Sequence, residues 1–259
     1  MRRALGVLSL IWKLYIAIVF GVTAILYYPI IFPLLLSESR KKKAFRVFVA
    51  WSWTVRVLCC YFVVRKRDHE LPNEAYIIIA NHSSYLDIFL MYSIMPKQPF
   101  IFFGKSEILG YPLIKTYFKR LNIPIYRSNS IRAAKALILG AKEVKKGWSL
   151  VIFPEGGIPD NDNPKMTEFK EGAFQLAKNL KVPIVPMTFS NNYKLFSDPT
   201  NILGPARPGV SHVHIHPFIT KEEIISLSKI ELKQKCFNII NGPLLENYPD
   251  LVGINKTKQ

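Results

Sequence analysis

Short apolar runs alternate with longer amphipathic segments over most of the chain after residue 74. Short apolar runs bounded by Gly, Pro and polar residues predict buried strands, and the longer segments predict helices. The expected strands span residues 75–80, 99–103, 122–126, 149–153, 182–189 and 210–218. The expected helices span residues 84–94, 130–146, 167–179 and 221–240. Strands that alternate with helices predict an α/β domain with a largely parallel central sheet flanked by helices.

Two apolar stretches precede this domain. The first, from Leu14 to Leu36, carries no charge and as a helix would be about 35 Å long, enough to cross a bilayer core. The second, 44–64, follows at once, and basic residues flank the first on both sides, including the lysines at 41–43. Positive charge at both ends opposes placing either end outside the cell. We therefore expect residues 1–64 to form a membrane-associated helical hairpin whose cations contact lipid phosphates, and residues 65–259 to form the α/β domain.

This arrangement places the α/β domain on the cytoplasmic face of the cell membrane. The alternative is a cleaved signal peptide, because Arg2 and Arg3 precede the apolar stretch. No small-residue cleavage site follows that stretch, which argues against cleavage.

The composition narrows the class of partner. A net charge of +17 over 259 residues indicates an acidic partner such as anionic lipid, nucleic acid or an acidic protein. No RNP, KH or zinc-finger signature is present, which argues against nucleic acid. Cys59 and Cys60 are adjacent and Cys236 is far away, a spacing that fits neither a disulfide framework nor a metal site and suits a reducing compartment.

The most informative segment is the polar cluster Asn81–Asp87, directly after the first expected strand. Side chains that follow such a strand lie at the carboxyl edge of the sheet, where α/β proteins bind ligands. His82 there is a candidate general base, and Asp87 can reach its imidazole if the histidine precedes the helix and Asp87 lies in the first turn. The alternative is a capping box of Ser84 and Asp87, in which the carboxylate only caps the helix.

Asn81–Asp87 resembles the N-H-x-x-x-x-D box of the glycerolipid acyltransferases, the family of the bacterial 1-acylglycerol-3-phosphate acyltransferases. Three further boxes follow in the family's order. They are Phe153-Pro154-Glu155-Gly156, Phe169-Lys170-Glu171-Gly172-Ala173 and Val182-Pro183-Ile184-Val185-Pro186. A weaker match ends in Ile125-Tyr126-Arg127. The resemblance covers residues 74–190 well and the last 60 or so residues poorly.

The resemblance implies a role for each matching residue. His82 would be the catalytic base and Asp87 its partner, while Glu155 and Gly156 would shape the acceptor pocket. The family usually continues with Thr-Arg after this glycine, and its arginine binds the acceptor phosphate. Here Gly157 and Ile158 occupy those positions. Other cations are therefore needed if the acceptor carries a phosphate, and the candidates are Arg127, Lys105 and Lys170.

The implied reaction is transfer of a fatty acyl group from an acyl thioester, acyl-CoA or acyl-acyl-carrier protein, to the free hydroxyl of a lysolipid. The family's acceptor is 1-acylglycerol-3-phosphate, and the mechanism needs no metal or other cofactor. One alternative keeps the chemistry but uses a lyso-aminolipid, such as lyso-ornithine or lyso-glycine lipid, which the missing arginine favours. Another, from a different class, is a non-catalytic basic protein of the membrane surface.

Other catalytic motifs fit poorly. The chain has no G-x-S-x-G sequence, which argues against the catalytic serine of an α/β-hydrolase. His212, His214 and His216 alternate and would share one face of a strand, but no further metal ligand lies in that segment.

Overall fold

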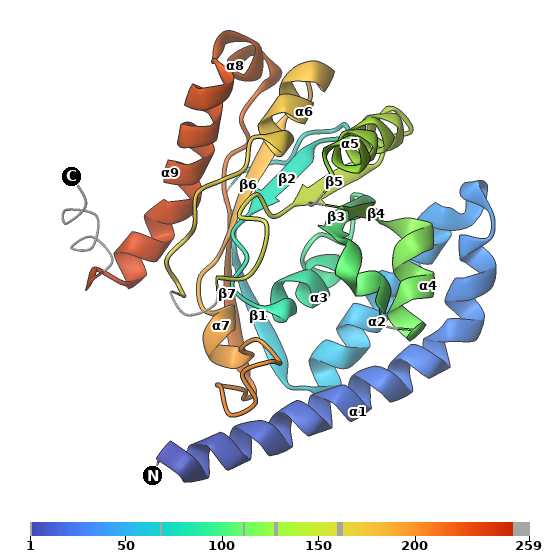
Figure 1. Ribbon diagram of the computed structural model, residues 1–259, viewed down its shortest axis with the longest axis vertical. Helices are drawn as coiled ribbons and strands as arrows, with labels where there is room; N and C mark the ends of the chain where they lie inside the picture. Colours follow the sequence, from blue (N-terminus) through green and yellow to red (C-terminus); the bar gives the residue numbers. More distant parts are fainter. Residues whose placement is uncertain (1, 68, 111, 127–128, 160–162, 251–259) are drawn as a thin grey trace.

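The computed structural model describes residues 2–67, 69–110, 112–126, 129–159 and 163–250 (Figure 1). Within these residues, seven strands form one sheet in the order β1-β7-β6-β2-β5-β3-β4. They are β1 (Tyr61–Lys66), β2 (Ile77–Ala80), β3 (Phe100–Lys105), β4 (Ile123–Ile125), β5 (Ser149–Ile152), β6 (Ile184–Phe189) and β7 (Gly209–Ile215). The five strands from β6 to β4 run parallel, whereas β7 is antiparallel to β6 and β1 is parallel to β7. The largely parallel sheet predicted from the sequence is confirmed.

The centre of the sheet consists of β2 with β5 and β6 on either side. All three strands are buried along their whole length, because helices cover both faces of a parallel sheet, and this explains their continuous apolar sequences. Ile79 of β2 pairs with Ile152 of β5 and with Pro186 of β6. The three strands therefore end near one another, and the polar residues that follow them meet at the carboxyl edge.

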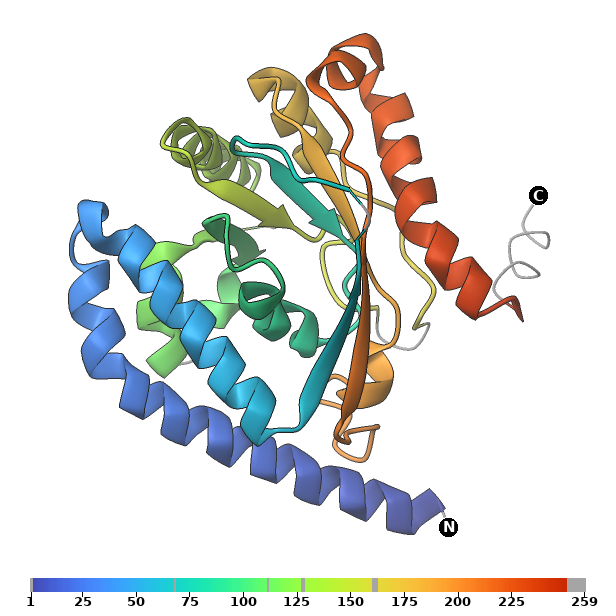
Figure 2. The ribbon, with the colours of Figure 1, turned by 180° about the vertical axis from the view of Figure 1, so that it is seen from behind.

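The helices form two layers around the sheet (Figures 1 and 2). One layer contains α5 (Ser130–Lys145), α6 (Gly172–Leu180) and α9 (Lys229–Asn247), and the other contains α2 (Lys41–Leu58), α3 (Tyr85–Ile94) and α4 (Pro112–Leu121). Two short helices are α7 (Asn192–Leu195), after β6, and α8 (Lys221–Ser226), before α9. Single 3-10 turns lie at Glu38–Arg40 and Ser106–Gly110.

Two of the expected helices differ from the prediction. The helix expected at 167–179 begins only at Gly172, because the preceding residues bond to the turn after β5: Thr167 donates to Glu155, and the Lys170 N–H donates to the Pro154 carbonyl. The helix expected at 221–240 is divided into α8 and α9. Ser228 and Glu231 form a second capping box that starts the new helix.

The N-terminal part contains one very long apolar helix, α1 (Arg2–Leu35), which runs along one side of the molecule (Figure 2). By length and composition, its segment Leu5–Leu35 is the one helix among the described residues that is able to span a membrane. The helix packs on α2, where the Trp51 indole N–H donates to the Thr23 hydroxyl at 2.9 Å. A membrane position for these helices stays a prediction.

The second apolar stretch is not helical throughout. Helix α2 ends at Leu58, Cys60 adopts a left-handed φ of 49°, and the chain continues as the edge strand β1. Strand β1 therefore spans residue 64, at which the sequence pattern divides the chain. The division into two domains itself stays a prediction.

Candidate active site

The turn between β2 and α3 brings His82 and Asp87 together. Ser84 caps α3, and Asp87 is the third residue of the helix, so the chain folds back and places the imidazole over the first helical turn. The distance between His82 Nδ1 and Asp87 Oδ2 is 3.0 Å. The sequence spacing predicted this geometry, in which the histidine precedes the helix and the carboxylate lies within it.

The Asp87 carboxylate is held from several directions. It is fully buried, and Oδ2 also accepts the backbone N–H groups of Ser83 and Ser84 at 2.8 and 2.9 Å. Oδ1 accepts the side-chain amide of Asn192 at 2.7 Å. Asp87 therefore caps the helix and contacts His82 at the same time, so the capping interpretation and the histidine pair do not exclude each other.

His82 is fixed both through its ring and through its backbone. The imidazole stacks on Phe153, with ring centroids 4.2 Å apart and an interplanar angle of 20°. The His82 N–H donates to Glu155 Oε1 at 2.8 Å. With Nδ1 directed to Asp87, Nε2 forms no hydrogen bond with the residues that the structure describes, and its side chain is 11% exposed. The ring is thus oriented but still accessible at its second nitrogen.

Glu155 links the catalytic turn to the segment before α6. Its Oε2 accepts the Thr167 N–H at 2.8 Å, while its Oε1 holds His82. Burial raises the pKa of the Glu155 carboxyl to about 7, although the two backbone N–H groups that donate to it act in the opposite direction. Both carboxylate oxygens are used to hold the protein backbone, so the geometry makes Glu155 a positioning residue for His82.

Gly156 and Lys170 lie at this same turn. Gly156 has a left-handed φ of +85°, which favours glycine. A Cβ on Gly156 would lie 2.8 Å from the Lys170 ammonium nitrogen, so the lysine side chain crosses directly over the glycine. Lys170 is exposed, and its position beside Gly156 was not predicted from the sequence. Its contact with an acceptor phosphate stays a prediction.

Two asparagines at the site were given no role from the sequence: Asn81, the first residue of the N-H-x-x-x-x-D box, and Asn192. The Asn81 side chain donates to the Phe189 carbonyl at 2.9 Å and accepts the Phe189 N–H at 2.7 Å, which extends the pairing of β2 with β6. Asn192, three residues after Phe189, is thereby brought onto Asp87. Both asparagines are buried. The rule that polar residues after parallel strands share one edge, applied to β6, would have found Asn192.

The sequence matches the model of a known protein family. The model of the Acyltransferase family matches residues 61–190. The chain belongs to the acyltransferase family. The matched region contains His82, Asp87 and Glu155, and Asn192 lies just beyond its end.

Proteins with similar sequences are named 1-acyl-sn-glycerol-3-phosphate acyltransferases. The 1-acyl-sn-glycerol-3-phosphate acyltransferase of Saccharomyces cerevisiae is 38% identical over 137 residues, which cover 50% of this chain and 43% of the yeast protein. The one from Borreliella burgdorferi is 28% identical over 182 residues, 69% of this chain and 68% of that protein. The chain spans less than half the length of the yeast and Cocos nucifera relatives, 43% and 40% respectively.

The fold has a close relative among solved structures. The 1-acyl-sn-glycerophosphate acyltransferase PlsC from Thermotoga maritima superposes with a TM-score of 0.77 and 21% sequence identity, covering 95% of this chain and 97% of that one. This likeness supports the fold.

The structure does not connect the other two predicted substrate-binding residues, Lys105 and Arg127, with the His82–Asp87 pair. Lys105 is exposed at the end of β3, two strands away from β2 in the sheet order, and it shares no hydrogen bond with the His82–Asp87 pair. Arg127 lies outside the described residues. The roles predicted for both stay predictions.

Of the three alternating histidines, His212 and His214 lie on β7 and His216 directly follows it. The rings of His214 and His216 are 4.1 Å apart, and His216 Nε2 lies 2.8 Å from the Thr188 hydroxyl. Across the described part of the chain, no three His, Cys, Asp or Glu side chains are grouped so that they could hold a metal ion.

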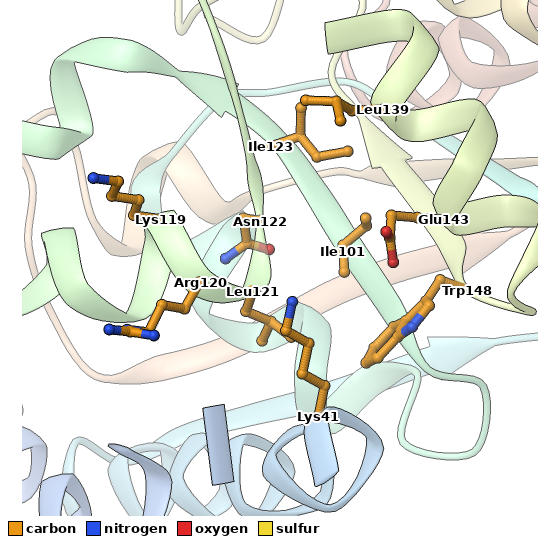
Figure 3. Close-up of a pocket in the computed structure, with 10 residues that line it drawn as sticks. All are labelled: Lys41, Ile101, Lys119, Arg120, Leu121, Asn122, Ile123, Leu139, Glu143 and Trp148. Atoms are coloured by element: carbon orange, nitrogen blue, oxygen red, sulfur yellow. The ribbon is translucent and has the colours of Figure 1, made fainter. Parts of the chain in front are cut away.

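A cavity of about 120 Å³ lies at the opposite, amino-terminal edge of the sheet (Figure 3). Two of its polar lining groups are engaged by the protein, because Asn122 accepts the Phe102 N–H and Glu143 pairs with Lys146. None of the predicted site residues lines it. The lining residues are Lys41, Ile101, Lys119, Arg120, Leu121, Asn122, Ile123, Leu139, Glu143 and Trp148.

Proposed function

We propose that this protein transfers a fatty acyl group from an acyl thioester to the sn-2 hydroxyl of 1-acylglycerol-3-phosphate, giving phosphatidate. The observation that carries the proposal is the His82–Asp87 pair at the carboxyl edge of the sheet, in a chain of the acyltransferase family. The acceptor is taken from the relatives, several of which are named 1-acyl-sn-glycerol-3-phosphate acyltransferase.

The reaction begins with proton removal. His82 Nε2 takes the proton of the acceptor hydroxyl as its oxygen attacks the thioester carbonyl, and a tetrahedral intermediate forms. Asp87 keeps the proton on Nδ1 and stabilises the imidazolium by its negative charge, 3.0 Å away. The intermediate then expels the thiolate, which takes the proton from the imidazolium. One C–O bond forms, one C–S bond breaks, and His82 returns to its starting state.

The surrounding residues serve this proton transfer. Asn192 and the two backbone N–H groups hold the Asp87 carboxylate against His82. Glu155 holds the His82 backbone, and Phe153 supports the flat face of its ring. The supports come from the turn itself, from residues 153–155 and from Asn192, so the pair is oriented before substrate binds, and preorganisation of this kind lowers the activation barrier.

The donor and the location are further parts of the proposal. Acyl-CoA and acyl-carrier protein are both acidic, and the net charge of +17 suits either. The long apolar helix α1 supports attachment to a membrane. We place the protein on the cytoplasmic face because basic residues flank the first apolar stretch on both sides.

A second acceptor class is favoured by one observation. Gly157 and Ile158 stand where the family usually has Thr-Arg, so a phosphate-binding arginine is missing from that position. A lyso-aminolipid acceptor would not require it. The non-catalytic alternative gives no reason for a histidine and carboxylate held together by three segments of the chain.

The test is an acylation assay with purified full-length protein. Lysophosphatidate, lyso-ornithine lipid and lyso-glycine lipid are each offered with acyl-CoA and with acyl-acyl-carrier protein. We expect phosphatidate as the main product. A higher kcat/KM on a phosphate-free acceptor would replace the proposed substrate, and no product from any pair would support the non-catalytic alternative.

A further inference from the structure

Helix α5 carries a row of exposed side chains in which two isoleucines lie among three lysines. Residues three and four positions apart lie on one face of a helix. We call this row the α5 face, and it consists of Ile131, Lys135, Ile138, Lys142 and Lys145. Ile131 and Ile138 are 69% and 57% exposed, and all three lysines are exposed. From residue 131 to residue 145 the α5 face is about 21 Å long.

The lysines of the α5 face have no acidic partner among the residues that the structure describes. Glu143, the one carboxylate in the sequence of α5, pairs instead with Lys146 at 2.6 Å. Helix α9 differs, because its lysines pair with carboxylates of neighbouring segments. These pairs are Lys229 with Glu171, Lys233 with Glu168 and Lys235 with Glu223. The α5 face therefore keeps three positive charges that the fold itself does not neutralise.

The α5 face lies on the opposite side of the sheet from the long apolar helix α1. Helix α5 packs on β4, β5 and α6, whereas α1 packs on α2 and α4, in the layer on the other side of the sheet (Figures 1 and 2). A bilayer that covers the exposed apolar side of α1 would therefore lie beyond the α2–α4 layer, away from α5. This arrangement favours a soluble partner of the α5 face over a lipid surface.

Helix α5 begins at the same edge of the sheet as the catalytic turn. Strand β4, which precedes α5, is parallel to β3, and β3 and β2 are both parallel to β5. The carboxyl ends of these strands therefore share one edge, where α5 begins at Ser130. Three strand spacings separate β4 from β2, a distance of about 14 Å. A partner bound to the α5 face would thus lie beside His82 without covering it.

We propose that the α5 face is the docking surface for an acidic acyl-carrier protein, which delivers the acyl thioester to His82. The carrier holds its thioester at the end of a long flexible arm, so it can dock beside the catalytic turn rather than on it. A row of this length, with apolar side chains among the cations, matches a protein surface in which apolar contacts lie among complementary charges. The phosphates of acyl-CoA would occupy only a small part of it. This inference rests on the proposed acyl transfer and names its donor.

The first test removes the charges of the α5 face and compares the result with an equal change of net charge on α9, where the lysines already have acidic partners. The two full-length triple variants are Lys135→Gln, Lys142→Gln, Lys145→Gln on α5 and Lys229→Gln, Lys233→Gln, Lys235→Gln on α9. Each is assayed with lysophosphatidate and either palmitoyl-acyl-carrier protein or palmitoyl-CoA. In the α5 variant, the KM of the carrier-protein donor should rise at least about tenfold, because three charge pairs with the carrier are lost. Its activity with palmitoyl-CoA should be unchanged, which also shows that it is folded, and the α9 variant should be unchanged with both donors.

The second test addresses the apolar part of the same surface. Ile138→Ser is compared with Ile230→Ser, because Ile230 on α9 is similarly exposed, at 67%. Ile138→Ser should raise the KM of the carrier-protein donor about threefold or more, because less apolar surface is buried against the carrier. Ile230→Ser should change the KM of neither donor.

Three results would overturn the docking surface and leave the proposed acyl transfer standing. The first is an equal rise in KM for both donors, or no rise for the carrier protein, in the α5 variant. The second is weaker binding of that variant to vesicles of phosphatidylglycerol and phosphatidylcholine, which would make the α5 face a lipid contact. The third is a wild-type protein that uses palmitoyl-CoA but not palmitoyl-acyl-carrier protein. A wild-type protein inactive with both donors would instead refute the proposed function.

Discussion

Replacing Glu155 with Gln should weaken the connection between the catalytic turn and the segment before α6. Glu155 accepts the His82 N–H through Oε1 and the Thr167 N–H through Oε2, each at 2.8 Å. Glutamine has one carbonyl oxygen, and its amide nitrogen cannot accept, so one of these two N–H groups loses its partner. Thr167 is exposed but the His82 N–H is buried, so a glutamine that leaves the His82 N–H unsatisfied lowers the free energy of unfolding by about 1–3 kcal/mol.

The difference between wild type and Glu155→Gln should also depend on pH. Burial raises the pKa of the folded-state Glu155 carboxyl to about 7, above its ordinary value of 4.5. The unfolded chain releases this proton near pH 4.5 and the folded chain only near pH 7. The stabilisation that comes from the bound proton is therefore complete below pH 4.5 and lost as the pH rises to about 7. Its full size is about 3 kcal/mol, and glutamine lacks it because it does not titrate.

The assay is urea unfolding in detergent, followed by tryptophan fluorescence at pH 4.5, 6 and 8. The excess stability of wild type over Glu155→Gln should be largest at pH 4.5 and smallest at pH 8. Glu168→Gln is the matched control, since the Glu168 side chain is 85% exposed and pairs only with Lys233 among the described residues. A difference for Glu155→Gln that stays constant over this pH range would refute the raised pKa and the burial argument behind it.

Three further substitutions test the rest of the site. Asn192→Ala removes a hydrogen bond to the buried Asp87 carboxylate, so kcat should fall about 10- to 100-fold. Asn191→Ala is the control, because the Asn191 side chain bonds to the backbone of Val210 and His212 instead. The kcat of the folded Asn191→Ala protein should be unchanged. Asp87→Asn should lower kcat steeply, because an amide cannot stabilise the imidazolium; a loss of stability alone would favour a purely capping role. Arg127→Ala should raise the KM of the acceptor far more than that of the donor, with partial rescue by Arg127→Lys, and equal wild-type activity on acceptors with and without phosphate would exclude the phosphate contact.

The sequence predicted the parts of the site that depend on local spacing. His82 and Asp87 lie within one strand-to-helix turn, so their distance along the chain was enough to predict that they meet. Glu155 was placed correctly at a neighbouring strand end, but its bond to the His82 N–H depends on β5 lying directly beside β2. Asn192 was missed because its contact with Asp87 depends on the pairing of β2 with β6. The order of strands in a sheet is set by tertiary packing, which no single motif encodes.

In the fold, too, features set by local sequence were predicted and features set by tertiary packing were missed. Continuous apolar runs located the buried strands, and the Thr220–Glu223 capping box located the start of α8. The extension of the second apolar stretch into β1 was missed, because Tyr61–Lys66 is stabilised by pairing with β7, far away in the sequence. The late start of α6 has a similar cause, since Thr167 is held by Glu155 across the turn.

The most direct test of the account is the turnover of His82→Ala. The substitution removes the group that takes the proton from the acceptor hydroxyl, and the stability of the folded protein is monitored by the urea assay described above. With lysophosphatidate and acyl-CoA, or acyl-acyl-carrier protein, kcat should fall by at least about 10²- to 10⁴-fold, the usual contribution of a general base. A folded His82→Ala protein with near-normal kcat would contradict the proposed mechanism.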